Sequence, residues 1–227
     1  MENRQGINGM IQGDYFDKGT DFSASDFVGP LYQLWVKKNF PKNTDEEQGF
    51  KPWLGQLIHQ ASYEHPEVNV VKEFSFVLHH DIDTSIGGSV DRCALDEYGV
   101  WHIEDLKSQG NFPAQKSFKE PSDSWIKQLS IYKLGMESCG FKVSDGAVIH
   151  QYVMGFQKKK GSDMKEYNKI DITLMSEADT VDLINTGINV ARNSLPPMMD
   201  CAKYLCKDYC SWNQACPSYN QNNLGDI

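Results

Sequence analysis

The segment IEDLK, residues 103–107, constrains the fold of this chain more than any other stretch of its sequence. Apolar residues recur through it and just before it, and Gly99 precedes them, a pattern typical of a β-strand that begins after a turn. Side chains alternate between the two faces of a strand, so Asp105 and Lys107 are predicted to project from the same face. A carboxylate and an ammonium group would then lie side by side.

A second strand is predicted just before this one, over residues 88–95 of the segment GGSVDRCAL. The four residues between the strands, 96–99, have turn composition, so the two strands are expected to form a hairpin. Folding of this hairpin can bring Asp91 beside Asp105. Two carboxylates about 4 Å apart repel by roughly 4 kcal/mol at an effective dielectric constant of 20, so such a pair usually indicates a bound cation or a shared proton.

These residue types favour metal-dependent cleavage of a phosphodiester. A carboxylate can hold a hard cation, while the lysine beside it orients or deprotonates the attacking water. Oxygen ligands favour Mg²⁺ or Mn²⁺, and His59, at the end of the segment GQLIH, would add one imidazole that shifts the preference toward Mn²⁺. Further along, Gln128 and Tyr132 stand four residues apart, so they share one face of a predicted helix.

Each of these motifs also has an ordinary structural explanation when it is taken alone. An isolated D-x-K on a strand is usually part of a solvated face, and an isolated histidine on a helix is more often a core or surface residue. A QxxxY pair on a helix is usually involved in packing. The ordered combination is much rarer than any of its parts, and it favours the functional interpretation.

In order and spacing these motifs resemble the RecB-type branch of the PD-(D/E)XK nuclease superfamily. That branch includes nuclease domains of recombination complexes, CRISPR-associated exonucleases and phage exonucleases. The resemblance covers residues 55–132 in motifs and extends to the C-terminus in layout. It implies an α/β (α+β) fold with a restriction-endonuclease-like αβββαβ core, in which helices flank a mixed central sheet.

The resemblance also implies a role for each motif residue. Lys107 is the implied catalytic lysine, while Gln128 and Tyr132 match the QxxxY motif that supports the active site and contacts DNA. Glu104 stands where an apolar residue is usual, and by strand alternation it is expected to face away from the metal. The implied metal ligands, in chain order, are His59, Asp91, Asp105 and the backbone carbonyl of Leu106.

Hydrophobic periodicity, caps and breakers divide the chain into elements that match this core by class. A mobile arm is expected over residues 1–20, the nuclease domain over 21–197, and a cysteine-rich segment packed on that domain over 198–227. Residues 110–121 contain a glycine and two prolines and are predicted to be a loop that borders the substrate channel. Helices are predicted at 31–39, 46–64, 122–138 and 176–193, with strands at 68–79, 88–95, 100–108, 147–157 and 168–175.

The net charge of −9 is unusual for a protein that handles DNA. Screening over about 8 Å at physiological salt makes the local charge more important than the total. Lys158, Lys159 and Lys160 form a local cluster, as do Lys37 and Lys38 earlier in the chain. A phosphate contact explains the lysine triplet no better than a solvated hairpin tip does, so both interpretations stay open.

Four of the six cysteines fall in the last part of the chain with the spacing C-x4-C-x3-C-x5-C, at Cys201, Cys206, Cys210 and Cys216. Without a secretory signal, disulfides are disfavoured and metal ligation is the first alternative. All-sulfur ligation suits an iron-sulfur cluster or a tetrahedral Zn²⁺, and reduced thiols without metal are the third alternative. The resemblance to RecB-type nucleases implies that an iron-sulfur cluster here would be of the [4Fe-4S] type. Cys93 and Cys139 have no spaced partners and are expected to be small buried hydrophobic residues.

The sequence therefore predicts a divalent-metal-dependent DNA nuclease, most simply an exonuclease on single strands or DNA ends in recombination, repair or phage replication. The alternatives are a structure-specific or restriction-like endonuclease and a non-catalytic nucleic-acid-binding module with a zinc knuckle. No GxxxxGK[ST] phosphate loop occurs, so a helicase or recombination protein is the expected partner on duplexes. The first ten residues lack the regions of a signal peptide, which predicts a cytoplasmic protein of a bacterium or a phage-infected cell.

Overall fold

The structure is a computed structural model that describes residues 20–40, 67–158, 163–197 and 216–217. Three expectations from the sequence lie wholly or largely outside these residues. They are the N-terminal arm, the helix over residues 46–64 that carries His59, and the cysteine-rich segment, of which Cys216 alone among its cysteines is described.

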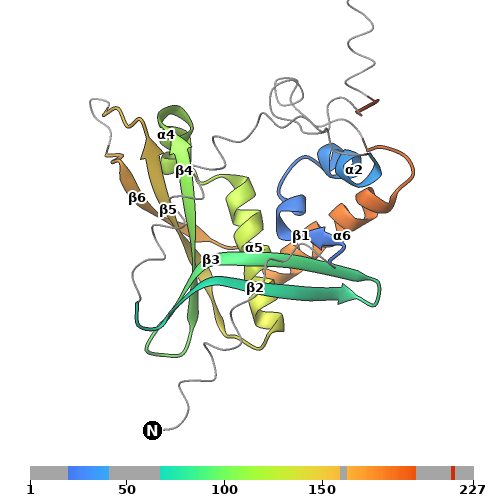
Figure 1. The fold of residues 1–227 in the computed structure, drawn as a ribbon, viewed down its shortest axis with the longest axis horizontal. Coiled ribbons are helices and arrows are strands. Elements are labelled where there is room, and N and C mark those ends of the chain that lie inside the picture. Colours follow the sequence, from blue (N-terminus) through green and yellow to red (C-terminus); the bar gives the residue numbers. More distant parts are fainter. Residues whose placement is uncertain (1–19, 41–66, 159–162, 198–215, 218–227) are drawn as a thin grey trace, which may run out of the picture.

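Within the described residues, six strands form one mixed sheet in the order β1-β3-β4-β5-β6, with β2 paired to β3 (Figure 1). The β1/β3 and β4/β5 pairs are parallel, and the other three pairs are antiparallel. This arrangement confirms the mixed α/β fold predicted from the sequence. The strands are β1 (Phe22–Ser23), β2 (Val70–Asp81), β3 (Thr84–Leu95), β4 (Trp101–Gly110), β5 (Val143–Met154) and β6 (Tyr167–Thr173).

The long strand β3 has two different neighbours along one of its edges. Its start pairs with β1 through Ile86 and Gly87, whereas its end pairs with β4 from Arg92 to Leu95. Among the described strands, none pairs with residues 88–91 on this edge. The predicted hairpin of β3 and β4 is confirmed, and its ladder opens at the position where Asp91 and Asp105 stand.

Three of the described helices begin and end within about one residue of the predicted positions, whereas η1 and α4 were not predicted. They are the short 3-10 helix η1 (Ala24–Phe27) and the α-helices α2 (Leu31–Asn39), α4 (Asn111–Lys119), α5 (Asp123–Ser138) and α6 (Glu177–Arg192). Ser122 precedes the first turn of α5, and the Ser176 hydroxyl caps α6 by accepting a hydrogen bond from the Asp179 N–H at 3.1 Å. None of the described helices has the length and apolar character needed to cross a membrane.

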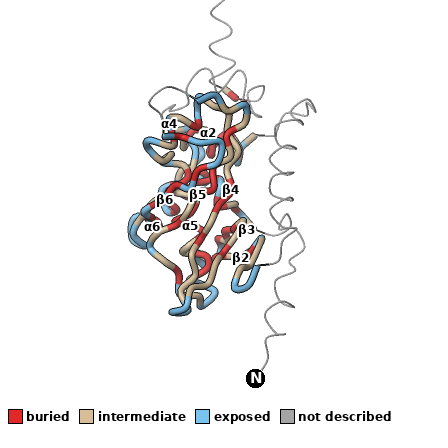
Figure 2. Tube along the Cα trace, turned by 90° about the vertical axis from the view of Figure 1, so that its left-hand side faces the viewer, coloured by how far each residue is buried: buried red, intermediate tan, exposed pale blue. Residues whose placement is uncertain are grey.

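The main core lies between α5 and the sheet, where buried positions of the strands and the helix face one another (Figure 2). Ile103, Leu129 and Ile149 are fully buried there. The Phe76 ring fills a notch between β3 and α5, because a Cβ atom added at Gly88 or Gly135 would stand 2.4 or 2.2 Å from it. Only glycine at both positions allows α5 to approach the sheet this closely.

The loop predicted over residues 110–121 is wrong, because the structure forms helix α4 there. Gly110 stands at the N-cap, and Pro113 lies in the first turn, where a missing N–H costs nothing. Ala114 and Ser117 are buried, and Ala114 packs against Val153 of β5. The glycine and prolines therefore mark the ends of a short helix, which the sheet stabilises by covering one of its faces.

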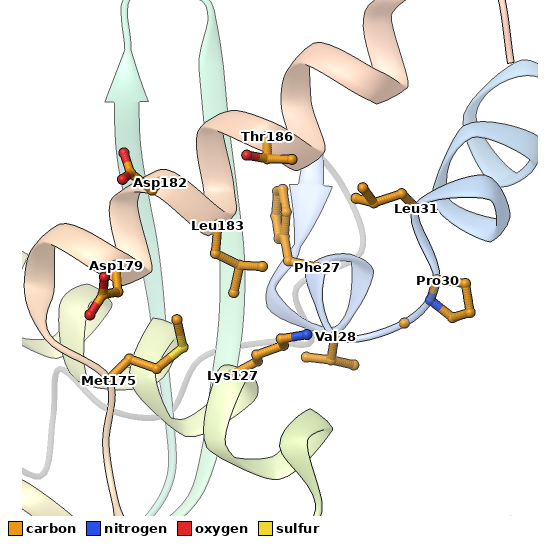
Figure 3. A pocket seen from close by; sticks show the side chains of 11 residues that line it. Phe27, Val28, Pro30, Leu31, Lys127, Met175, Asp179, Asp182, Leu183 and Thr186 are labelled. Carbon is orange, nitrogen blue, oxygen red and sulfur yellow. The ribbon is translucent and has the colours of Figure 1, made fainter. Parts of the chain in front are cut away.

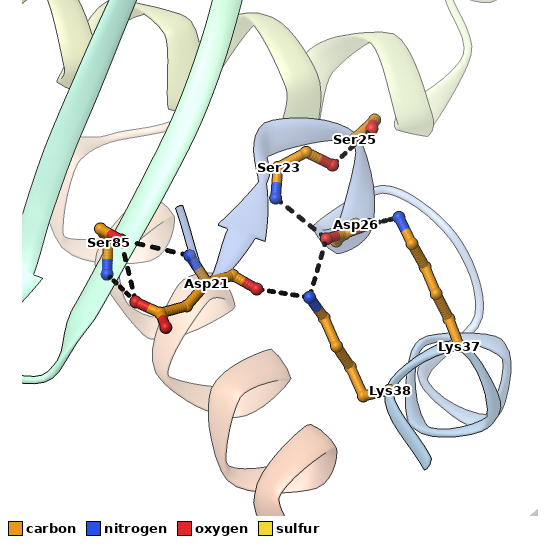
Figure 4. Close-up of polar contacts among 7 residues, drawn as sticks. All are labelled: Asp21, Ser23, Ser25, Asp26, Lys37, Lys38 and Ser85. Carbon is orange, nitrogen blue, oxygen red and sulfur yellow. Dashed lines mark hydrogen bonds and ion pairs between the residues drawn. The ribbon is translucent and has the colours of Figure 1, made fainter. Parts of the chain in front are cut away.

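The two early lysines have a structural role in the N-terminal part of the fold (Figure 4). Lys37 and Lys38 of α2 both form ion pairs with Asp26 of η1. Burial alone would raise the pKa of Asp26, but its hydrogen bonds and these two ammonium groups lower it. Asp21 accepts hydrogen bonds from the Ser85 backbone N–H and hydroxyl, at 2.8 and 2.9 Å, and so fastens the start of β1 to β3.

Candidate active site

Strand β4 brings Asp105 and Lys107 together, as strand alternation predicts. The Lys107 Nζ atom lies 2.8 Å from Asp105 Oδ2. Asp105 is only 1% exposed, whereas the Lys107 side chain keeps 24% of its surface exposed. Burial of the carboxylate makes this ion pair stronger than one in bulk water, and the partly exposed ammonium can still meet a ligand from solvent.

Asp91 reaches the same place from β3. The last residue pair of the β3/β4 ladder is Arg92 with Glu104, so the next step would place Asp91 opposite Asp105. At that step the backbone pairing has ended, and a side chain links the two strands instead. Asp91 Oδ2 accepts a hydrogen bond from the Leu106 backbone N–H at 2.9 Å. The two aspartates predicted to meet are therefore held on adjoining strands, one of them by the backbone that follows the other.

Helix α5 contributes the two residues of the QxxxY motif. Gln128 Oε1 accepts a hydrogen bond from Lys107 Nζ at 3.2 Å, and Gln128 Nε2 donates to the Tyr132 hydroxyl at 2.7 Å. Burial raises the pKa of Tyr132, and the negative charges of Asp105 and Asp91 raise it further. The phenol therefore stays protonated at neutral pH, and a continuous polar chain leads from Tyr132 through Gln128 and Lys107 to Asp105.

The strand alternation of β2 and β3 slips by one residue beside Asp91. Val90 and Cys93, three residues apart on β3, are both buried in the main core. On β2, Glu73 falls opposite Asp91 in the register, and it has a φ of 55°. A left-handed conformation is unfavourable for a residue with a side chain and often marks a functional site. Sequence reasoning gave no warning of this slip.

The donor set fits a hard divalent cation. Two carboxylates and the carbonyl of Leu106 are oxygen donors, and Mg²⁺ is commonly bound by one or two carboxylates while it keeps several waters. Within the described residues, no group of three or more His, Cys, Asp or Glu side chains could hold a metal ion. His59, the remaining implied ligand, lies outside them.

The back of β4 holds a second polar cluster, which confirms that Glu104 faces away from Asp105. Glu104 forms an ion pair with Arg92, and His150 Nε2 lies 3.1 Å from Glu104 Oε2. Burial alone would raise the pKa of Glu104, but hydrogen bonds from His150 and Arg92 outweigh it and lower the pKa to about 2. This cluster ties β3, β4 and β5 together behind the site.

Sequence reasoning missed a third polar cluster, which fastens α4 beside the site. Gln109 follows Lys107 by two residues, and its Oε1 accepts hydrogen bonds from Ser117 of α4 at 2.7 Å and from Gln151 of β5 at 3.0 Å. Gln151 is fully buried and also accepts a hydrogen bond from Asn168 of β6 at 3.1 Å. The alternation of Asp105, Lys107 and Gln109 is the signal that could have identified it.

The remaining predicted residues are not gathered at this site. Lys158 is exposed beyond the end of β5, and the other two lysines of the triplet lie outside the described residues. Cys216 is buried against Tyr32 and Trp35 in a separate apolar cluster. Cys93 is buried as expected, and burial raises its pKa to about 12. The expectation of burial is wrong for Cys139, which is exposed at the C-terminal end of α5.

A pocket of about 740 Å³ lies elsewhere, between the turn after η1, helix α5 and helix α6 (Figure 3). Phe27 and Leu183 line its apolar part, while Asp179 and Asp182 project from α6. None of the five described polar residues of the site lines this pocket. The pocket is therefore separate from the candidate active site.

Comparisons with known proteins identify the superfamily and the fold. A sequence model of the PD-(D/E)XK nuclease superfamily matches residues 55–217, more than half of the chain. The crystal structure of SSO0001 aligns with a TM-score of 0.60 and 16% identity, over 91% of this chain and 89% of that one, which shows a shared fold. A phage-related exonuclease from Haemophilus somnus 129PT aligns with a TM-score of 0.39 and 13% identity, over 82% of this chain and 95% of that one. This TM-score is too low to show a shared fold. No curated protein shows significant similarity to the chain.

Proposed function

Because the chain belongs to the PD-(D/E)XK nuclease superfamily, we propose that it is a divalent-metal-dependent DNA nuclease of the RecB-type branch, acting as an exonuclease on single strands or DNA ends. The observation that carries this proposal is the placement of the Lys107 ammonium, 2.8 Å from Asp105 Oδ2 and 3.2 Å from Gln128 Oε1. An ammonium group held between two fixed acceptors keeps a defined direction for its remaining N–H bond. Such a group can hold a water molecule against a phosphorus atom.

In this proposal each side chain has one task. Lys107 donates a hydrogen bond to the attacking water and stabilises negative charge as it develops on the phosphate. Gln128, braced by Tyr132, fixes the ammonium in position. Asp105 and Asp91, together with the Leu106 carbonyl and with His59, would hold Mg²⁺ or Mn²⁺. When bound, that ion would lower the pKa of a coordinated water and offset charge on the scissile phosphate.

The Asp91–Leu106 hydrogen bond supports the assignment of the carboxylates. It uses one oxygen of Asp91 and fixes the carboxylate relative to the backbone of β4. A ligand held by such a contact loses little further conformational freedom when it binds a cation, which favours affinity. The same contact aligns Asp91 with the strand that carries Asp105 and Lys107.

An end-labelled cleavage assay tests the proposal. The purified protein would be incubated with Mg²⁺ or Mn²⁺ and with single-stranded, double-stranded and circular DNA. Release of mononucleotides or short oligonucleotides from an end, with circles left intact, is the expected result. Discrete internal cuts, or cleavage of circles, would instead identify an endonuclease, and binding without cleavage would identify a non-catalytic module.

The variant Asp105→Asn assigns any cleavage to this site. It keeps the shape of a buried side chain while it removes the charge that a cation requires, so cleavage should fall at least about 10³-fold. Asp123→Asn is a matched control, because Asp123 is an exposed residue of α5 that forms a surface ion pair with Lys127. Cleavage by Asp105→Asn within about tenfold of wild type would place the chemistry elsewhere.

We keep the cysteine-rich segment as a separate part of the proposal. Cys201, Cys206, Cys210 and Cys216 would hold a [4Fe-4S] cluster or, failing that, Zn²⁺, and ligation would add its free energy to folding. Protein purified without oxygen should be brown with broad absorbance if it holds the cluster. It should be colourless, with zinc found by elemental analysis, if it holds Zn²⁺. Elemental analysis that finds neither metal would leave four reduced thiols.

A further inference from the structure

Helix α4 presents an unusual outer face next to the candidate active site. Phe112, Lys116 and Lys119 recur at the i, i+4 and i+7 positions, so they lie along one side of the helix. All three residues are exposed, and Phe112 is 80% exposed. The opposite side of the helix, with Ala114 and Ser117, is buried against the sheet.

The position of this face is fixed relative to Lys107. Strand β4 leads directly into α4, with Gly110 as the N-cap, and α4 stands at the end of that strand (Figure 1). Gly110 follows Lys107 by three residue steps of the strand, a span of about 10 Å, which equals about three nucleotides of a stacked strand. The Ser117–Gln109 hydrogen bond holds the helix on the same face of the sheet as Lys107.

The charge of this face suits the phosphates of a nucleic-acid backbone. Gln157 donates its backbone N–H to the Asn111 side-chain oxygen at 3.2 Å, so the exposed Lys158 stands near the first turn of α4. Within the described residues, no ion pair joins Lys116, Lys119 or Lys158 to a carboxylate, whereas Lys37 and Lys38 are both paired with Asp26. Exposed carboxylates also stand near α4, because Glu120 follows the helix and Asp163 precedes Met164, which packs in the same apolar cluster as Ala114.

We propose that the outer face of α4 is a single-strand binding surface, on which Phe112 stacks against one base while Lys116 and Lys119 contact phosphates. An exposed aromatic ring beside exposed lysines is the usual composition of such a surface, because every base offers a face for stacking and the backbone supplies the negative charge. This inference rests on the proposed nuclease function. It names the part of the substrate that the protein binds, at least about three nucleotides from the cleaved bond.

The test measures binding of fluorescent oligothymidylates of about 12 nucleotides to the Asp105→Asn protein, so that cleavage does not interfere. Phe112→Ala should weaken binding about 5- to 100-fold, and Phe112→Trp should restore it. Tyr98→Ala is the matched control, because Tyr98 is 79% exposed in the turn before β4, at the opposite end of that strand. This control should change binding by less than about twofold.

Abasic nucleotides make the test specific for stacking. Each position of the oligonucleotide would be made abasic in turn. Loss of the base at one position should weaken binding to the Asp105→Asn protein that retains Phe112. The same substitution should cost nothing further in Phe112→Ala, because the stacking partner is already absent. The proposal is overturned if each abasic substitution weakens binding equally in the two proteins, or if Phe112→Ala binds the oligonucleotide with unchanged affinity. The second result is also the one expected if Phe112 contacts a protein partner instead of DNA.

Salt dependence tests the lysines separately. Lys116→Gln and Lys119→Gln should each reduce the slope of log K against log salt by about 0.7, the value for one phosphate of a single strand. Lys142→Gln, an exposed lysine just before β5, should leave the slope unchanged. If the parent protein cleaves DNA but these variants behave like their controls, the inference fails and the nuclease function stands. A parent protein that neither binds nor cleaves DNA would contradict both.

Discussion

Lys107 on the sheet and Gln128 on α5 are joined by a hydrogen bond of 3.2 Å, and this contact makes the candidate active site a product of two elements. Strand β4 alone places the ammonium beside Asp105, but a lysine side chain has four rotatable bonds and would keep much of its freedom. Gln128 removes that freedom because its own amide group is held by Tyr132. The orientation of Lys107 therefore depends on how α5 packs against the sheet.

The first prediction separates binding from catalysis at Lys107. Lys107→Ala leaves both aspartates in place, so DNA binding in Ca²⁺ should survive while turnover falls by about 10²- to 10⁴-fold. Lys142→Ala, which removes an exposed lysine before β5, is the control and should keep full turnover. Equilibrium binding and single-turnover cleavage would be measured on the same oligonucleotide. If both fell together, Lys107 would be a phosphate anchor.

A second prediction orders the two residues of the QxxxY motif. Gln128→Leu removes a hydrogen bond to a charged group, worth about 1.5–3 kcal/mol, so kcat should fall about 10- to 150-fold with little change in KM. Tyr132→Phe keeps the ring against Phe76 and removes only a neutral hydrogen bond, so its effect should be about fivefold. Steady-state kinetics would show the order. A larger loss in Tyr132→Phe than in Gln128→Leu would mean that the phenol acts directly on the substrate.

The third prediction concerns the close approach of α5 to the sheet. Gly135→Ala would place a methyl group 2.2 Å from the Phe76 ring, so it should destabilise the fold by at least about 1–3 kcal/mol. It should also lower activity, because the shift of α5 would displace Tyr132. Gly99→Ala is the control, because its φ of 75° costs about 1–2 kcal/mol but nothing lies within 4 Å of the added atom.

Urea unfolding and cleavage assays would be made on both glycine variants. Gly99→Ala should lose stability and keep the activity of its folded fraction. Gly135→Ala should recover part of its loss when Phe76→Leu makes room for the methyl group. Full activity of folded Gly135→Ala would show that the site tolerates movement of α5.

The fourth prediction is a pH dependence of stability from the cluster behind β4. The pKa of Glu104 falls from 4.5 to about 2 on folding, so its contribution is fully present above pH 4.5 and is lost as the pH falls toward 2. Its size is on the order of 3 kcal/mol. Glu104→Gln should therefore be less stable than wild type at pH 7, and the difference should shrink between pH 4.5 and 2.

Urea unfolding at several pH values would check this dependence. Glu120→Gln is the matched control, because Glu120 is exposed just after α4 and forms no ion pair with another residue of the described part of the chain. That variant should follow the wild-type curve at every pH. A constant difference between Glu104→Gln and wild type over the acidic range would contradict the assignment of the effect to the Glu104 carboxylate.

The sequence by itself determined the local parts of this protein. The period of two along residues 103–107 places Asp105 and Lys107 on one face whatever surrounds the strand. The turn after Leu95 fixes the β3/β4 hairpin, and the cap at Ser176 fixes the start of α6. These features depend on residues close in the chain, so they can be derived without knowledge of the core.

Only the tertiary structure decided how these parts meet. Helix α4 forms although its segment contains Gly110 and Pro113, because burial of Ala114 and Ser117 against β5 stabilises it. The slip of alternation at Glu73 depends on how two strands share the core, which no local pattern records.

The contact between Lys107 and Gln128 is the clearest case of this kind. Sequence spacing placed Gln128 and Tyr132 on one helical face but did not say which of them would reach the lysine. That choice follows from the depth at which Phe76 lets α5 pack, and packing depth is set by contacts between residues far apart in the chain.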